Sequence, residues 1–318
     1  MTLHKINLLG GTGFIGSHLI QELVKLHDVN TSILSHRRKV DLNLPKTCKV
    51  IRGSLLDKES LDNFIEPRST VINLSNIGAE SFGDNMAGAL NLARVCTAKK
   101  VKRIIHCSTA VVAGRTTCSV VNEETKCIPS TAYEKNKLQI ENLLLDRIKK
   151  NTEIVIVRPT AVFGRNGKNL LKLAKEVRLK SRAILLLKTS LNYRRRLNLI
   201  SVENVAAAFL FFVKSKDSYY RQRFIVSDDN VEENNYFDVV NLLCKYFRKR
   251  PVRAMFIPFR YAILRAGLIA LRRSNICSDR VYSADKLFNS GFRPPVQFQD
   301  GIKKFADWYI KTLGNMGY

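Results

Sequence analysis

The feature that most constrains the fold is a glycine-rich turn between an apolar strand and an amphipathic helix, KINLLGGTGFIGSHLIQELVK at residues 5–25. Gly10, Gly13 and Gly16 form the pattern G-x-x-G-x-x-G. The first glycine permits a tight turn, the second lets backbone approach a pyrophosphate, and the third lets the helix pack on the strand. Free N–H groups at the start of the helix then face the phosphates. The stretch predicts the first βα unit of a dinucleotide-binding fold.

The second predicted strand, VNTSILS at residues 29–35, ends without the acid that an NAD-type site offers to the ribose hydroxyls. The chain continues as His36, Arg37 and Arg38. A guanidinium suits a 2′-phosphate through paired hydrogen bonds. These residues favour NADP(H) as the cofactor, with Arg37 and Arg38 as its contacts, over NAD(H). The other interpretation is that both arginines are merely solvated at a strand end.

Strands and helices alternate through the rest of the first half, in CKVIRG, LDNFI, STVINLS, NMAGALNLARVCTAKK, RIIHCSTAVVAG and EIVIVRPTAVFG. This rhythm predicts an α/β fold, a Rossmann-type doubly wound parallel sheet with a smaller, interleaved C-terminal substrate-binding domain. We expect residues 1–165, together with about 196–227, to form the dinucleotide-binding domain. Residues 166–195 and 228–318 are then the substrate-binding part.

The rhythm loosens beyond residue 165. A basic helix is expected over NLLKLAKEVRLKSR, residues 169–182, and a strand leading into a helix over YRRRLNLISVENVAAAFLFFV, residues 193–213. Residues 254–274 are apolar but interrupted by Arg260 and Arg265. We favour a packed helix of a capping domain there, because the apolar face is too short and broken to demand lipid. The alternative is a helix on a membrane surface, so membrane association is expected to be peripheral at most.

The formal net charge is +26, and most of it lies in the C-terminal half. Residues 151–318 carry 31 basic and 13 acidic residues, a net charge of +18. Such a surface attracts nucleic acid, anionic membrane or an acidic substrate. The seven cysteines are scattered without a C-x-x-C pair, so neither a metal site nor a disulfide framework is expected. With no signal peptide or spanning segment evident, the sequence predicts a cytoplasmic protein.

The sequence YEKNK, residues 133–137, places Tyr133 four residues before Lys137, which puts both on one helical face. Alone this is a weak pattern. Together with GGTGFIG (10–16), NMAGALN (85–91), STAVVAG (108–114), RPTAVFG (158–164), RRRLNLISVENVAAA (194–208) and the C-terminal SADKLFNSGFRPP, it resembles the extended short-chain dehydrogenase/reductase family. More narrowly, the chain resembles the nucleotide-sugar 4-epimerases and 4-keto-reductases of polysaccharide synthesis.

The resemblance implies a catalytic set of Thr109, Tyr133 and Lys137. Thr109 lies 24 residues before Tyr133 (133 − 109), and Ser108 is the competitor for its role. Tyr133 would exchange a proton with a carbonyl or hydroxyl oxygen, and a nearby Lys137 ammonium should favour its phenolate. The implied cofactor contacts are Gly10, Gly13, Phe14, Ile15, Gly16, Arg37, Arg38, Ser75, Tyr133, Lys137 and Pro159. The sugar dehydratases have an Asp-Glu pair after this threonine, whereas Ala110 and Val111 follow here, so dehydration is not expected.

The resemblance also implies a nucleotide-diphosphate sugar as substrate and allows a homodimer. The implied substrate contacts are Asn85, Ser108, Arg165, Arg196 and Arg280, of which Arg196 aligns with the arginine that grips the pyrophosphate. Three functions stay open at this point. The first is NADP(H)-dependent reduction of a 4-keto group, the second is NAD-dependent 4-epimerisation, and the third is a non-catalytic cofactor-binding or nucleic-acid-associated role. No specific nucleic acid is expected, and the intact catalytic set favours the enzymes.

Overall fold

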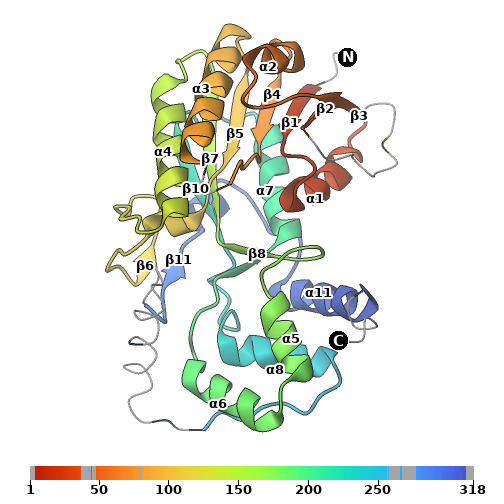
Figure 1. Cartoon of the computed structure of the whole chain (residues 1–318), viewed down its shortest axis with the longest axis vertical. Coiled ribbons are helices and arrows are strands. Elements are labelled where there is room, and N and C mark those ends of the chain that lie inside the picture. The colour runs from red at the N-terminus through yellow and green to blue at the C-terminus, as the bar shows by residue number, and fades with distance from the viewer. Residues whose placement is uncertain are drawn as a thin grey trace. The chain divides into compact units, whose positions relative to one another are not determined.

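The computed structural model describes residues 4–36, 44, 48–78, 81–255, 257, 266 and 277–312. Contacts within the chain define two compact units (Figure 1). Unit 1 comprises Met1–Val112, Pro129–Arg158 and Val205–Phe224, and unit 2 comprises Ala113–Ile128, Pro159–Asn204 and Ile225–Tyr318. Each unit contains segments from widely separated parts of the sequence.

A seven-stranded sheet with helices around it confirms the predicted Rossmann-type fold. Its strand order is β10-β7-β5-β4-β1-β2-β3, and the pairs from β7 to β3 are all parallel. Parallel strands covered on both faces read as nearly continuous apolar runs, which is why these segments could be found in the sequence. The strands are β1 His4–Leu9, β2 Val29–Ser35, β3 Cys48–Arg52, β4 Thr70–Asn73, β5 Arg103–Cys107, β7 Glu153–Pro159 and β10 Gln222–Val226.

One core cluster of unit 1 lies between the sheet and its helices. Val71 of β4 and Ile104 of β5, both fully buried, meet Leu92 of α3 and Leu144 of α4 in this cluster. Helices α3 and α4 also pack along each other. The helices that include residues of unit 1 are α1 Phe14–Leu23, α2 Lys58–Phe64, α3 Phe82–Ala98, α4 Ala132–Arg147 and α7 Val202–Lys214.

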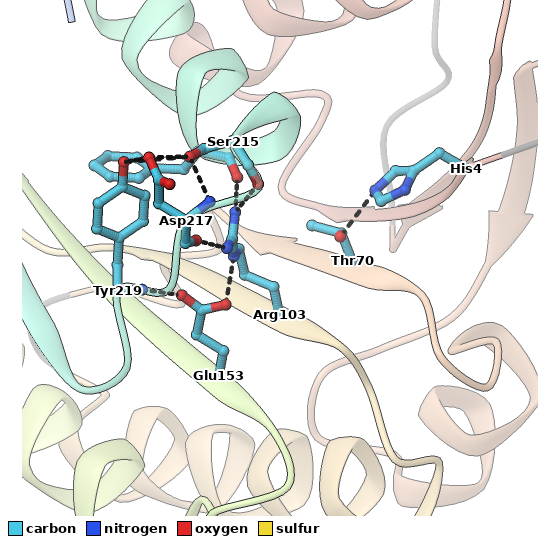
Figure 2. A network of polar contacts seen from close by, with 8 residues as sticks. His4, Thr70, Arg103, Glu153, Ser215, Asp217 and Tyr219 are labelled. Atoms are coloured by element: carbon cyan, nitrogen blue, oxygen red, sulfur yellow. Dashed lines mark hydrogen bonds and ion pairs between the residues drawn. The ribbon is translucent and has the colours of Figure 1, made fainter. Parts of the chain in front are cut away.

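A buried arginine ties the start of β5 to the C-terminal end of α7 (Figure 2). Arg103 pairs with Glu153 of β7 at 2.8 Å and donates to the backbone oxygens of Phe212, Ser215 and Asp217. Glu153 in turn accepts from the backbone N–H of Tyr219. The last carbonyls of a helix have no intrahelical partner, so Arg103 supplies donors that this helix end lacks.

Unit 2 has two short parallel pairs of strands and its own apolar core. Strand β8 Ala161–Phe163 pairs with β9 Leu199–Ser201, and β6 Val120–Val121 pairs with β11 Val281–Tyr282. Phe163 lies edge-on to Phe298 and Phe305, with ring centroids 6.2 and 6.4 Å apart. The helices among its described residues are α5 Leu171–Leu179, α6 Arg182–Asn192, α8 Tyr236–Tyr246, α10 Asp285–Asn289 and α11 Phe298–Thr312.

The helix predicted over residues 169–182 is present as α5 but is shorter than predicted, and the helix that follows it was not predicted. Helix α5 ends at Leu179, Lys180 is extended, and a second helix α6 begins at Arg182. The Ser181 hydroxyl accepts from the backbone N–H of Ile184, which caps the new helix and explains the break. Most of the segment 254–274 lies outside the described residues. Within the described ranges, no helix is both long and apolar enough to cross a membrane.

Candidate active site

The glycine turn joins β1 to α1 at the carboxyl end of the sheet. Gly10 has φ +79°, and a Cβ there would lie 2.7 Å from the carbonyl carbon of Leu74 after β4. A Cβ on Gly16 would lie 2.3 Å from the Gly10 oxygen. Gly13 caps α1 without any side-chain hydrogen bond. The turn therefore exposes backbone without side chains, together with N–H groups at the start of α1. Such a surface can bind a pyrophosphate.

The carboxyl ends of β2 and β3 border a pocket of about 560 Å³. Its lining residues with ionisable side chains are His36, Arg52 and Asp57. Asp57 caps α2 by accepting from the backbone N–H groups of Glu59 and Ser60. Arg37 and Arg38 lie outside the described residues. Arg52 was not predicted from the sequence as a site residue. It could have been, because it lies at the end of a predicted strand, as the basic residues after β2 do.

A capping box starts α4 and fixes the position of Tyr133. The Thr131 hydroxyl accepts from the backbone N–H of Glu134 at 3.3 Å, and the Glu134 carboxylate accepts from the backbone N–H of Thr131 at 3.2 Å. The spacing T-x-x-E encodes this box. Tyr133 thus lies in the first turn of α4, with 36% of its surface exposed.

Thr109 and Ser108 follow β5 and are both buried. Burial raises the pKa of Tyr133 above its usual value, and the nearby Cys107 adds to this shift. The Thr109 side chain lies close enough to the Tyr133 phenol to lower its pKa through hydrogen bonding, which offsets only part of the shift. The Ser108 hydroxyl has no hydrogen-bond partner among the described residues. It is a buried polar group with unused bonding capacity beside the Tyr133–Thr109 pair.

Lys137 lies one turn beyond Tyr133 on α4 and is 6% exposed. Its Nζ donates to the backbone oxygen of Cys107 at 3.3 Å. Burial lowers the pKa of Lys137, while Cys107 and Glu141 oppose the shift. Burial and the charge of Lys137 also lower the pKa of His106 to about 3, so this ring is neutral. Lys137 is not among the groups that shift the pKa of Tyr133, so the expected lowering by this ammonium is not seen, and burial has the largest effect on the phenol.

Two other predicted residues lie near the ends of β4 and α3 in unit 1. The Ser75 backbone N–H donates to the Asn73 side chain at 3.0 Å. The Asn85 amide donates to the backbone oxygens of Gly78 and Ser81 at 2.5 and 2.8 Å, and accepts from the N–H of Ile77 at 3.3 Å. Asn85 of α3 therefore links this helix to the backbone of Ile77, Gly78 and Ser81.

Phe14 and Ile15 open α1 in unit 1, and unit 2 contains the other predicted residues that the structure describes. Pro159 ends β7 and is buried, and Arg165 is exposed just after β8. Arg196 donates through Nη1 to the backbone oxygens of Val231 and Glu232 at 2.8 and 3.3 Å. Arg280 is fully buried and donates to the backbone oxygens of Gly114 and Thr116. The Arg280 Nε is also buried, and it has no hydrogen-bond partner among the described residues.

A pair of adjacent buried carboxylates in unit 2 was not singled out from the sequence. Burial raises the pKa of Asp228 to about 7 and that of Asp229 to about 6. Asn204 donates to Asp228 at 3.3 Å, and Asn198 donates to Asp229 at 2.6 Å. The signal that could have revealed the pair is two consecutive acids directly after the strand RFIVS. Both carboxylates are buried and accept hydrogen bonds from side-chain amides instead of from water.

A dinucleotide fits these residues in unit 1. The turn at Gly10 and Gly16 excludes side chains, and the first turn of α1 has no side-chain cap. Ser108 offers a buried hydroxyl with unused capacity, and Lys137 has used one of its three donors on the described residues. The site thus places a glycine turn whose geometry suits a pyrophosphate and a tyrosine with a hydroxyl neighbour in the same unit.

Comparisons with known proteins agree with this geometry. Residues 6–226 match the model of the NAD dependent epimerase/dehydratase family. The UDP-glucose 4-epimerase of Vibrio cholerae is 26% identical over 96% of both chains. The UDP-glucose 4-epimerase of Dictyostelium discoideum is 23% identical over 47% of this chain, and the chain spans about half its length, 48%.

A similar fold occurs in the dTDP-glucose 4,6-dehydratase of Bacillus anthracis, solved in complex with NAD. That structure has a TM-score of 0.73 and 15% identity, and the match covers 98% of each chain. At this identity the likeness concerns the fold alone. The family match covers most of the chain and includes the glycine turn, Thr109, Tyr133 and Lys137. The chain therefore belongs to the NAD dependent epimerase/dehydratase family, among the enzymes of the extended short-chain dehydrogenase/reductase type.

Proposed function

We propose that the chain is an NADP(H)-dependent oxidoreductase that reduces the 4-keto group of a nucleotide-diphosphate sugar. The observation that carries the proposal is the contact of Thr109 with Tyr133 at the carboxyl end of β5, with Lys137 one turn further along α4. This is the arrangement that proton transfer to a carbonyl oxygen requires.

The chemistry assigned to the chain's own residues follows from their environment. The raised pKa keeps Tyr133 protonated at neutral pH, which is the form that donates a proton to a carbonyl oxygen. The Thr109 hydroxyl, in contact with the phenol, would hold the same oxygen. By family resemblance, Lys137 would bond the nicotinamide ribose. The bound cofactor supplies the hydride.

The preference for NADP(H) rests on the absence of an acid directly after β2 and on the basic residues near the strand ends. His36 and Arg52 line the 560 Å³ pocket, and the sequence adds Arg37 and Arg38 after His36. The acid of this pocket, Asp57, is already committed to capping α2. Guanidinium groups bind phosphate through paired, charge-assisted hydrogen bonds.

The proposed substrate follows from the family and from the named relatives. The Vibrio cholerae relative is a UDP-glucose 4-epimerase, so a nucleotide-linked sugar is the substrate class that we assign. We assign binding of the pyrophosphate to Arg196. Within the described residues its side-chain hydrogen bonds use only Nη1, which leaves the N–H groups of Nε and Nη2 for the substrate. A homodimer is part of the same proposal, and light scattering tests it.

The decisive experiment incubates the purified chain with NADPH or NADH and a panel of UDP- and GDP-linked 4-ketosugars. We expect one NADPH to be oxidised per sugar reduced, and a lower KM for NADPH than for NADH. Arg52→Ala and the double variant Arg37→Ala/Arg38→Ala should narrow that difference. Equal use of both nucleotides by the unmutated chain would contradict the assigned cofactor.

The 4-epimerases among the relatives support a second candidate function. An epimerase would use Thr109, Tyr133 and Lys137 to oxidise and re-reduce one carbon with a retained NAD⁺. It would interconvert two UDP-sugars without net change in the nicotinamide absorbance. Turnover in neither assay would leave the non-catalytic, cofactor-binding function.

A further inference from the structure

Helix α6 of unit 2 has apolar side chains on its exposed face and polar side chains on a buried one. Ile184 and Leu187 are 43% and 58% exposed and lie three residues apart, on one helical face. Thr189 and Ser190 are fully buried. A surface helix of a globular protein normally has the opposite arrangement, with apolar residues inside. The other side of α6 is already occupied, because it packs on α8 and buries Leu185.

The exposed apolar surface continues into α5. Leu179, the last residue of α5, is 54% exposed. With Ile184 and Leu187 it places three of the described chain's exposed large apolar side chains within nine residues of sequence. We call these three residues the α5–α6 face. In Figure 1, α6 lies at the edge of unit 2, next to α5 and α8.

The surroundings of the α5–α6 face are strongly basic. Residues 171–188 contain six basic residues and one acidic residue. The single acid, Glu176, is already paired with Lys188 at 2.9 Å. Lys172, Lys180 and Arg182 are exposed beside the apolar residues. Clusters of four to eight basic residues on an amphipathic helix are typical of binding to anionic lipid headgroups.

We propose that the α5–α6 face docks peripherally on an anionic membrane surface. Leu179, Ile184 and Leu187 would enter the boundary between headgroups and acyl chains, and the flanking basic residues would meet the lipid phosphates. Nucleic acid would engage the charges but not the apolar side chains. A second copy of this chain would bring the same positive charge to the contact. The combination of charge and apolar exposure therefore favours a membrane.

The test measures flotation of the full chain with vesicles of phosphatidylcholine alone or mixed with phosphatidylglycerol. We expect binding to the anionic vesicles about tenfold tighter than to the neutral ones. Ile184→Ser/Leu187→Ser and, separately, Lys172→Glu/Lys180→Glu should each weaken this binding about tenfold. The matched control is Val120→Ser/Ile310→Ser, at sites in unit 2 that are 57% and 38% exposed, and it should bind like the unmutated chain.

Thermal denaturation and light scattering of every variant complete the design. The proposal is overturned if the unmutated chain ignores anionic vesicles or if the control loses as much binding as Ile184→Ser/Leu187→Ser. Tighter binding to duplex DNA, with no loss in the serine variant, would assign the charges to nucleic acid. A dimer that dissociates in the serine variant would assign the face to a second copy. Because the two double variants alter different residues, misfolding of one leaves the other as a test.

Discussion

At the scale of single residues, burial sets the protonation of the candidate active site. Tyr133 and Lys137 lie on one face of α4, yet the pKa of the first is raised and that of the second is lowered. Both shifts disfavour charge, as expected when desolvation exceeds the attraction between neighbouring groups. The phenol is therefore protonated over the whole neutral range, which is the form that the proposed reduction requires.

Tyr133→Phe removes that donor and little contact area. We expect turnover to fall by about 10²–10⁴, the usual contribution of a positioned acid, while cofactor affinity is retained. Steady-state rates together with a fluorescence titration of NADPH check both parts. Tyr220→Phe, at another partly exposed tyrosine, is the control and should change neither. Near-normal rates in Tyr133→Phe would remove this residue from the mechanism.

The buried carboxylate of Asp228 predicts a specific dependence of stability on pH. Its folded pKa of about 7 exceeds the ordinary value of 3.8, so the folded state binds more protons between these values. Its contribution to stability is therefore complete below about pH 4 and is lost as the pH rises through 7. Asp228→Asn keeps the shape without the charge. We expect it to raise the free energy of unfolding at pH 8 by up to about 4 kcal/mol.

Urea denaturation of Asp228→Asn at pH 5 and pH 8 measures this effect. The difference from the unmutated chain should grow with pH. Asp279→Asn, at an exposed acid of the same unit, should show no such trend. A destabilised Asp228→Asn at pH 8 would mean that the ionised carboxylate is a net stabilising group in this network.

At the scale of elements, the sequence predicts a strand or helix well where its apolar residues recur with a regular period. It predicts poorly where a single residue sets the boundary of an element. The strands β1, β2 and β4 and the turn at Gly10 were predictable, because apolar runs and glycines have few other interpretations. Helix α6 was not, since RAILLLKTSLN has no single apolar face and only Ser181 marks its start. The capping box of Thr131 and Glu134 follows from the spacing T-x-x-E. That it places Tyr133 in the first turn of α4 is known only from the structure.

Arg103 is the side chain whose loss should loosen elements most. Arg103→Met leaves Glu153 without its buried partner and removes donors from the end of α7. Removing one member of a buried pair costs about 3–5 kcal/mol, and we expect a loss of that size in urea denaturation. Arg147→Met breaks an exposed pair with Asp146 and should cost less than about 1 kcal/mol. Equal losses of stability in the two variants would show that the buried contacts of Arg103 stabilise the fold no more than an exposed ion pair does.

At the scale of the whole molecule, our proposals give the net charge of +26 two separable uses, in substrate binding and in docking on a membrane. Composition indicated the charge and its bias toward the C-terminal half, but not which cations face a substrate. That depends on long-range contacts such as those of Arg196 with Val231 and Glu232, and of Arg280 with Gly114. These partners are distant in sequence from the arginines that they bind, so the sequence around each arginine does not reveal them.

Arg196→Ala tests whether one guanidinium dominates substrate binding. We expect calorimetric binding of UDP- or GDP-sugars to weaken by about 1.5–3 kcal/mol, the range for hydrogen bonds to charged groups. Lys311→Ala changes the same formal charge at an exposed position and should matter little at physiological salt, where screening acts within about 8 Å. Similar losses in both variants would mean that the charge acts as a diffuse field.

The order of strands in the large sheet has a consequence for how the chain is made. Strand β10 forms the edge next to β7, yet 63 residues must be added after Pro159 to reach Gln222 (222 − 159). At about 5–20 residues per second, a ribosome needs about 3–13 s to add them. During this interval the nascent chain presents β7 with an open edge, and open edges recruit other strands. Synthesis that stalls between these residues should release aggregating fragments, so the vulnerable period of this protein precedes its completion.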